Sequence, residues 1–174
     1  MTACSSSPPV APEDCSLVRA LGVVGERWTM LLLRQAFYGV RRFDDMQAQL
    51  GTSRKVLADR LARMVDDELL ARVPYRDGAQ RTRHEYRLTE KGEALATVLV
   101  ALMQWGDRHM PHPDGRPLRV VDRATGQEVR AALVREDGWP VAGLATLSGE
   151  AWPDRPRAAA TSRDQDGAVE LAGR

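Results

Sequence analysis

The sequence is poor in aromatic residues and in cysteine. Aromatic side chains make up 5% of the 174 residues, so leucine, valine, alanine and methionine must supply most of a hydrophobic core. Both cysteines, Cys4 and Cys15, lie near the start of the chain, which is not the spacing of a disulfide framework. We therefore expect a reduced, cytoplasmic protein.

Long apolar segments and catalytic motifs are also missing. No apolar run approaches the roughly 20 residues that a membrane helix needs, and we expect no membrane association. The first residues, MTACSSSPPVAPED, lack the basic and apolar stretches of a secretion signal. The chain contains no nucleophile elbow, phosphate-binding loop or metal motif. We therefore expect no enzyme, no cofactor and no bound metal.

The charge of the chain is nearly balanced but unevenly placed. The formal net charge is +1, whereas residues 15–110 contain 16 Lys and Arg against 12 Asp and Glu, a surplus of 4. A basic central region is where a nucleic-acid-binding surface is expected. So small a surplus also fits an ordinary mixed surface, and the positions of the cations therefore carry more information than their number.

The most informative stretch is residues 41–70, which predicts two short helices separated by a tight break. Apolar residues recur three and four positions apart in both halves. Gly51 ends the first helix, because glycine tolerates the left-handed backbone found at helix ends. Thr52 or Ser53 can then cap the second helix with its hydroxyl group. This pattern indicates a helix-turn-helix, whose second helix enters the DNA major groove by its N-terminal end.

A β-hairpin is predicted directly after the helix-turn-helix. Two short alternating runs, at residues 71–75 and 84–88, flank a loop with the sequence RDGAQRTR. A hairpin in this position is the wing of a winged helix. Its tip carries three cations suited to DNA phosphates or the minor groove, namely Arg76, Arg81 and Arg83.

Three further helices are predicted around this unit. The first is capped by Asp14 and ends before Gly25, the second begins near Arg27 and runs through Phe37, and a long helix covers Glu90–Met110. The long helix has more apolar surface than one partner can bury. The economical explanation is a homodimer formed by this helix and the first helix. Two-fold symmetry would also place two recognition helices on a palindromic site.

The predicted fold is mainly α with a small β content. Residues 1–13 are expected to be a disordered tail, and residues 14–110 a winged helix-turn-helix domain for DNA binding and dimerisation. Residues 111–153 are expected to form a small β-rich appendage of two or three strands that leans on the main domain. Residues 154–174 are polar and alanine-rich, and we expect a flexible tail.

These segments resemble the HxlR family of winged helix-turn-helix regulators, which is related to the MarR group. The matching pieces are Cys15 ahead of the first helix, GERWTMLLLR at 25–34, GVRRFDDMQAQLGTSRKVLADRL at 39–61, HEYRLTEKG at 84–92 and WGDRHM at 105–110. The resemblance covers roughly residues 15–110. It implies a homodimeric, cytoplasmic transcription factor, often a repressor, joined through its first and last helices.

The chain departs from the family pattern at two points. Some related proteins continue into a cysteine-containing ribbon, whereas no cysteine follows Cys15 here, which excludes a cysteine-ligated zinc site in the appendage. Glu26 also stands where many relatives have a glycine.

The predicted DNA contacts centre on Ser53, Arg54 and Lys55, which open the second helix. An arginine there can bond guanine O6 and N7 together, which gives about 1–3 kcal/mol of discrimination between bases. The motif context favours DNA contact over a merely solvated helix start. The full set of expected contacts is Arg41, Arg42, Thr52, Ser53, Arg54, Lys55, Arg63, Arg76, Arg81 and Arg83.

Two regulatory sites are also predicted. By resemblance, Cys15 occupies the position at which some family members sense oxidants or electrophiles, and a thiol near a helix N-terminus can be more reactive. The alternative is an inert, partly buried thiol near the dimer contact. The expected effector pocket, whose residues could equally belong to the core, comprises Trp28, Phe37, Tyr38, Met103 and Trp105.

Two functions from different classes fit the sequence. The first is a dimeric regulator that binds double-stranded DNA sequence-specifically and responds to a small effector or to thiol oxidation. The second is a winged-helix protein-interaction module, in which the cations at 53–55 and 76–83 face a partner protein. A mobility-shift assay with duplex DNA distinguishes the two.

Overall fold

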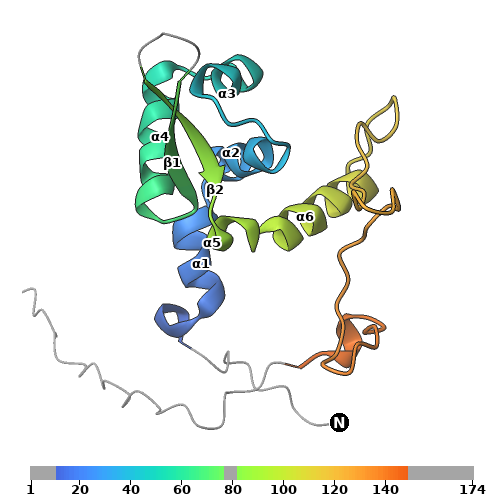
Figure 1. Ribbon diagram of the computed structural model, residues 1–174. Helices are drawn as coiled ribbons and strands as arrows, with labels where there is room; N and C mark the ends of the chain where they lie inside the picture. The colour runs from blue at the N-terminus through green and yellow to red at the C-terminus, as the bar shows by residue number, and fades with distance from the viewer. Residues whose placement is uncertain (1–10, 77–81, 149–174) are drawn as a thin grey trace, which may run out of the picture. The chain divides into compact units, whose positions relative to one another are not determined.

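The computed structural model describes residues 11–76 and 82–148 (Figure 1). Residues Ala11–Leu147 form one compact unit. Several predictions lie outside the described residues: the tail at 154–174, most of the tail at 1–13, Cys4, and Arg81 at the tip of the wing.

The order of elements is that of a winged helix-turn-helix. In chain order the elements are η1 (Pro12–Asp14), α1 (Ser16–Val24), α2 (Arg27–Phe37), α3 (Phe43–Leu50), α4 (Arg54–Asp66), β1 (Leu70–Tyr75), β2 (Arg83–Leu88), α5 (Glu90–Glu93), α6 (Ala96–His109) and η2 (Leu144–Thr146). Strands β1 and β2 pair antiparallel, with Leu70 opposite Leu88 at the base and Tyr75 opposite Arg83 toward the tip. The predicted fold class is confirmed.

The hydrophobic core joins α2, α3, α4 and the base of the wing. It is built from leucine, methionine and alanine, as the scarcity of aromatic residues requires. Leu33, Met46 and Leu61 have no solvent exposure at all. The buried cluster comprises Leu32, Leu33, Ala36, Met46, Leu57, Leu61, Met64, Leu69, Leu70 and Leu99.

The turn between α3 and α4 follows the sequence prediction closely. Gly51 adopts a left-handed conformation with φ of 62°, and its N–H donates to the carbonyl of Gln47. Ser53 is the residue that caps α4, because its Oγ accepts a hydrogen bond from the N–H of Val56 at 3.3 Å. The choice between Thr52 and Ser53, open from the sequence, is therefore settled in favour of Ser53.

The start of α1 differs from the prediction. Asp14 belongs to the short 3-10 helix η1, and α1 begins at Ser16 with Cys15 at the N-cap position. No side-chain hydrogen bond caps the helix. The reason is local: the N–H of Cys15 bonds to the carbonyl of Pro12, which turns the chain before α1 can start.

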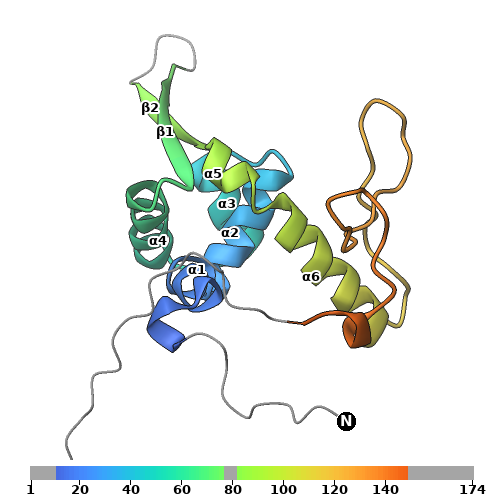
Figure 2. The ribbon, with the colours of Figure 1, turned by 90° about the horizontal axis from the view of Figure 1, so that it is seen from below.

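The single long helix predicted for Glu90–Met110 is two helices, α5 and α6. Thr89 caps α5, because its Oγ1 accepts a hydrogen bond from the N–H of Gly92 at 3.1 Å. Gly92 lies so close to the carbonyl of Leu69 that a Cβ at this position would clash. This contact holds α5 at the base of β2 (Figure 2), and two residues, Ala94 and Leu95, separate α5 from α6.

The segment after α6 does not form the predicted strands. Within 111–148 the structure has two isolated β-bridges, Val121–Glu128 and Val134–Pro140, and no strand. The prediction of two or three strands is therefore wrong. Each bridge closes a tight turn, at 122–127 and at 135–139, and Pro140 in the second bridge has no N–H to donate to a ladder.

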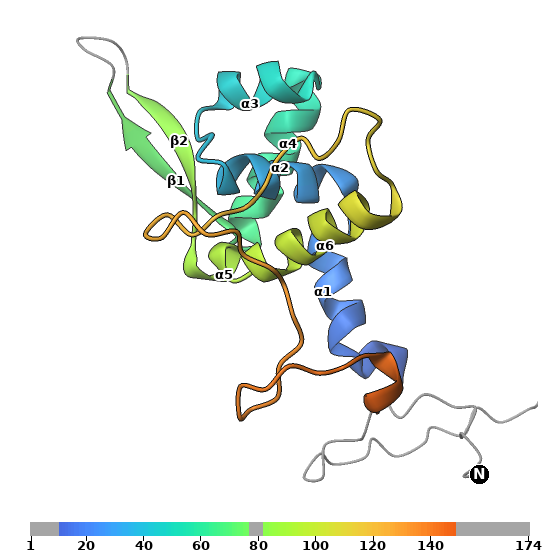
Figure 3. The ribbon, with the colours of Figure 1, turned by 90° about the vertical axis from the view of Figure 1, so that its right-hand side faces the viewer.

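This segment folds back along α6 (Figure 3), and the side chain of Gln104 in α6 bonds to its backbone. The Nε2 of Gln104 donates to the carbonyl of Val129 at 2.9 Å, and its Oε1 accepts from the N–H of Ala131 at 3.0 Å.

Among the described helices, none has both the length and the hydropathy needed to cross a bilayer.

Candidate nucleic-acid interface

The start of α4 presents cations to solvent. Ser53, Arg54 and Lys55 are all exposed, and the first turn of α4 contains no acidic residue. The unpaired N–H groups of a helix N-terminus carry partial positive charge, which adds to that of the two side chains. A phosphate or a base edge with acceptor atoms would be attracted here.

Arg54 is held in a defined position by α3. Its Nη1 donates to Oδ1 of Asp44 and to Oε1 of Gln47, both at 3.0 Å. Its guanidinium carbon also lies 4.8 Å from the centre of the Phe43 ring. The side chain is 68% exposed, and a surface ion pair contributes only about 0–1 kcal/mol to stability. The main effect of these contacts is therefore to orient the guanidinium group.

The contacts of Arg54 leave one edge of its guanidinium group available. A guanidinium has five N–H donors, and the two on Nη1 point to Asp44 and Gln47. The Nε–Nη2 edge takes no part in these bonds. Such an edge is a planar fork that matches two acceptors side by side, as in guanine O6 and N7.

A hollow of about 430 Å³ joins the start of α4 to the wing. Arg42, Arg54 and Arg83, all predicted DNA contacts, line it together with Arg72. The guanidinium of Arg42 lies 4.8 Å from the centre of the Tyr75 ring, which keeps this cation close to β1. The structure therefore brings cations from α4, the wing and the residues before α3 to one place.

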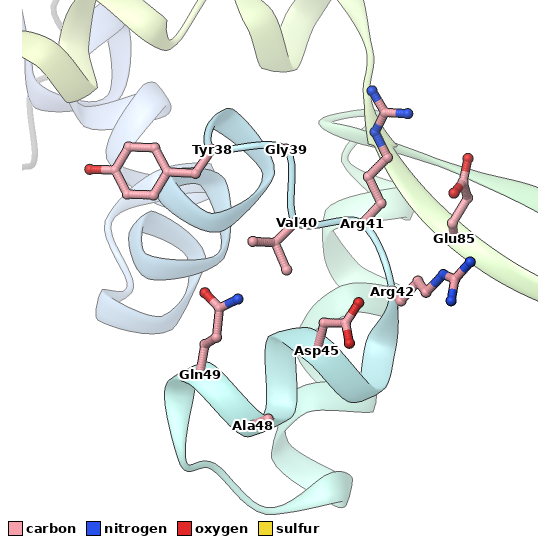
Figure 4. A pocket seen from close by; sticks show the side chains of 9 residues that line it. All are labelled: Tyr38, Gly39, Val40, Arg41, Arg42, Asp45, Ala48, Gln49 and Glu85. Carbon is pink, nitrogen blue, oxygen red and sulfur yellow. The ribbon is translucent and has the colours of Figure 1, made fainter.

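The other predicted DNA contacts lie elsewhere. Arg76 is exposed at the end of β1, where its Nε donates to Oγ1 of Thr82 at 3.4 Å. Thr52 is half-buried in the turn before α4. Arg41 extends in a different direction from Arg42 in Figure 4 and lines a second hollow of about 460 Å³, which shares Arg42 and Asp45 with the first.

Arg63 is paired with an acid in this structure. Its Nη1 lies 3.5 Å from Oε1 of Glu26, and Arg60 forms an ion pair with the other oxygen of the same carboxylate. Glu26 is the residue that departs from the family pattern. The sequence marked this position as unusual but gave no sign that its carboxylate would reach two arginines of α4.

The predicted regulatory residues do not form a single site. Cys15 is a half-buried free thiol, while Arg19 on the next turn donates to Oγ of Ser16. The hydroxyl of Tyr38 donates to Sδ of Met103 at 3.7 Å, and Trp105 is 55% exposed on α6. The pKa of Tyr38 is raised above its ordinary value of 10.0, mainly by burial. The charge of Arg34 opposes this increase, and the charge of Asp107 adds to it. Trp28 is half-buried beside Arg27, whose guanidinium carbon is 5.9 Å from the ring centre.

A comparison with known protein families identifies the family of this chain. The sequence pattern described as HxlR-like helix-turn-helix matches residues 23–114, which is more than half of the chain and covers α2 to α6. The chain belongs to the HxlR family. The match ends soon after α6, so most of the following segment lies beyond the HxlR pattern.

Relatives of this HxlR protein are named as regulators. It is 46% identical over 122 residues to Rv3095, an uncharacterized HTH-type transcriptional regulator of Mycobacterium tuberculosis, a match that covers 70% of this chain and 76% of that protein. It is 36% identical over 90 residues to YvaP, an uncharacterized HTH-type transcriptional regulator of Bacillus subtilis, covering 50% of this chain and 80% of that protein.

Two solved structures resemble this HxlR chain over more than the family pattern. PA1607, described as a candidate transcription factor, superposes with a TM-score of 0.68 at 38% identity, covering 79% of this chain and 95% of that chain. PA1374 of Pseudomonas aeruginosa, described in the same way, gives a TM-score of 0.55 at 34% identity, covering 82% and 96%. Both matches therefore extend beyond residues 23–114.

Proposed function

We propose that the protein is a transcriptional regulator that binds double-stranded DNA with the start of α4 and with the wing. One observation carries the proposal: cations of α4 and β2, Arg54 and Arg83, line the same hollow. A recognition helix and a wing that face one surface can contact the major groove and the adjacent backbone together. The names of its relatives agree with this function.

Arg54 is the residue to which we assign base recognition. Asp44 and Gln47 hold the side chain through Nη1, and Phe43 lies against its flat face. The Nε–Nη2 edge can then bond guanine O6 and N7 without a further loss of side-chain freedom. We assign phosphate contact to Lys55 and Arg83, because both are exposed and no described residue fixes either side chain, which suits contact with a non-directional charge.

The functional unit in this proposal is a homodimer. Helix α1 buries none of its own residues in the described chain, and Leu17 and Leu21 are 66% and 52% exposed. On α6, Leu102 and Trp105 are 54% and 55% exposed. Pairing α1 and α6 of two chains would remove these apolar side chains from water and place two recognition helices on a palindromic site.

The mode of regulation is proposed from the family resemblance. A dimer bound over a promoter would block transcription, which makes the protein a repressor acting in the cytoplasm. A small effector or oxidation of Cys15 would change its affinity for DNA. Cys15 lies at the start of α1, so a bulky oxidised group there would act on the proposed dimer contact.

The test is selection of bound duplexes from a random pool, followed by affinity measurements on the selected site at several salt concentrations. We expect the logarithm of the affinity to fall with log[salt] at ~0.9 per neutralised phosphate. Arg54→Lys keeps the charge but loses the planar fork, so it should lose the guanine preference. Arg83→Ala should weaken binding to all duplexes alike. Failure of the wild type to bind any duplex at moderate salt would refute the proposal.

The second function, a protein-interaction module, is favoured by one feature of the same hollow. Asp44 and Asp45 line it beside the arginines, and their carboxylates would repel phosphates. A surface with both signs of charge also suits a protein partner. Asp44→Asn discriminates between the two, because it should strengthen non-specific duplex binding if the hollow faces DNA.

A further inference from the structure

A hollow at the base of the wing is lined by both apolar and cationic residues. Its volume is about 480 Å³, within the range of small-molecule sites, and it lies between the end of α2, the end of β2 and the beginning of α6. One part of its lining is apolar and includes Phe37, Leu88 and Ala96. The lining also includes three arginines, Arg41, Arg87 and Arg123.

Two of these arginines have no acidic partner in the described part of the chain. Arg87 is paired with Glu85. Neither Arg41 nor Arg123 has a side-chain hydrogen bond or ion pair to any described residue. Glu93 also lines the hollow and Glu85 pairs with Arg87, so three positive charges stand against two negative charges here. An anion entering the hollow would meet an unbalanced positive field.

Arg123 reaches the hollow from the segment after α6, on a turn with several fixed bonds. Asp122 Oδ1 accepts from the N–H of Ala124 at 3.0 Å, and its Oδ2 accepts from the hydroxyl of Thr125 at 2.8 Å. The N–H of Gly126 also bonds to the carbonyl of Asp122. Nothing in the core requires this turn, because its residues are exposed. The turn sets Arg123 at the rim of the hollow.

We propose that this hollow binds a small aromatic carboxylate, with the ring on the apolar lining and the carboxylate on Arg41 and Arg123. Arginine recognises a carboxylate through a pair of parallel hydrogen bonds, which a compact cation cannot reproduce. A neutral aromatic compound would leave the cations without partners. A bare inorganic anion would leave the apolar lining without contact.

An occupied hollow would also affect the wing. Tyr86 in β2 donates its backbone N–H to the carbonyl of Arg41, so the wing and the residues before α3 are directly joined at this place. A ligand that bonds Arg41 and Arg123 would tie this junction to the segment after α6. The regulatory part of this inference rests on the proposed DNA-binding function, whereas binding of the carboxylate does not.

The test is a titration of the ¹⁵N-labelled full chain with sodium benzoate, followed by NMR at constant ionic strength and without DNA. Millimolar benzoate should shift the amide signals of Gly39, Leu88 and Arg123. Arg123→Ala should weaken benzoate binding about tenfold, whereas the matched variant Arg119→Ala, on the same segment but outside the hollow, should bind as the wild type does.

Two further probes separate the parts of the site. Benzamide has the same shape without the charge, and inorganic phosphate has charge without the ring, so both should bind more weakly than benzoate. Absence of benzoate shifts in the wild type, or equal binding by Arg123→Ala, would overturn the proposal. Phosphate binding as tight as benzoate binding would reduce the hollow to an adventitious anion site only and overturn the assignment.

The regulatory part has its own readout. Benzoate should change the duplex affinity of the wild type, and Arg123→Ala should abolish this response without altering duplex affinity in the absence of benzoate. If benzoate binds the hollow and duplex affinity stays constant, the carboxylate site is retained and its role in regulation is refuted. If no duplex binds at all, the DNA-binding proposal fails while the NMR titration still decides the carboxylate site.

Discussion

The winged domain and the segment after α6 are stabilised in different ways. In the winged domain, Leu33, Met46 and Leu61 are completely buried. In the segment after α6, Leu133 and Trp139 are 63% and 66% exposed, and turns and single hydrogen bonds hold the backbone instead. Burial distributes stability over many contacts, whereas each hydrogen bond acts locally. The same kind of substitution should therefore have very different effects in the two regions.

The largest difference is expected between two leucines. Leu61→Ala removes a fully buried side chain and should lower the free energy of unfolding by about 2–5 kcal/mol. Leu133→Ala removes an exposed side chain and should change it by less than about 0.5 kcal/mol. Urea unfolding followed by circular dichroism, at one protein concentration, measures both. Equal losses would show that the segment after α6 has a core contact of its own.

A pair of glycines should give effects of opposite sign. Gly92→Ala places a Cβ against the carbonyl of Leu69 and should destabilise the winged domain by about 1–3 kcal/mol. Gly106→Ala, in α6, places its Cβ in open space and should stabilise the helix by about 0.5–1 kcal/mol. Calorimetric melting temperatures would reveal the two shifts. An unchanged melting temperature of the Gly92→Ala variant would mean that α5 is not fixed at the wing.

Loss of the two hydrogen bonds between Gln104 and the segment after α6 should loosen that segment without destabilising the winged domain. Gln104→Ala removes both the donor to Val129 and the acceptor from Ala131, each worth about 0.5–1.5 kcal/mol. Trypsin should then cleave faster after Arg130 and Arg135, while urea unfolding of the winged domain stays nearly unchanged. Gln104→Glu, which keeps the acceptor, should show an intermediate cleavage rate. Unchanged cleavage in both variants would contradict this role.

The smallest effect is expected when the pH is lowered and the turn at 122–127 loses stability. The hydrogen bond from the N–H of Ala124, followed by that from Thr125, lowers the pKa of Asp122 below its ordinary value of 3.8. A lowered pKa in the folded state stabilises the turn above pH 3.8, and this contribution is lost as the pH falls through the folded-state value. The amide signal of Ala124 should therefore shift only in acid. The same shift at pH 6 would exclude Asp122 as its cause.

The sequence predicted those features that depend on neighbouring residues. Helical spacing located α3 and α4, the properties of glycine placed the turn at Gly51, and the hydroxyl residues after it narrowed the cap of α4 to Thr52 or Ser53. The alternating runs located the wing. These features depend on interactions between residues only a few positions apart, which is why the residue order suffices to predict them.

The features that were missed depend on contacts between distant residues. The break between α5 and α6 follows from Gly92 meeting Leu69, and the orientation of Arg54 follows from Asp44 and Gln47 on another helix. Short runs between proline and glycine turn signals also predicted strands after α6, where the described residues form two isolated β-bridges instead. Spacing cannot reveal which side chains meet across the fold.

The shared carboxylate of Glu26 suggests a route by which such proteins could diverge. One residue at the junction between α1 and α2 forms ion pairs with two arginines of the neighbouring helix α4. A single substitution, Glu26→Gly, would release both guanidinium groups at once. The cationic surface of a descendant could thus be enlarged without any mutation in α4 itself.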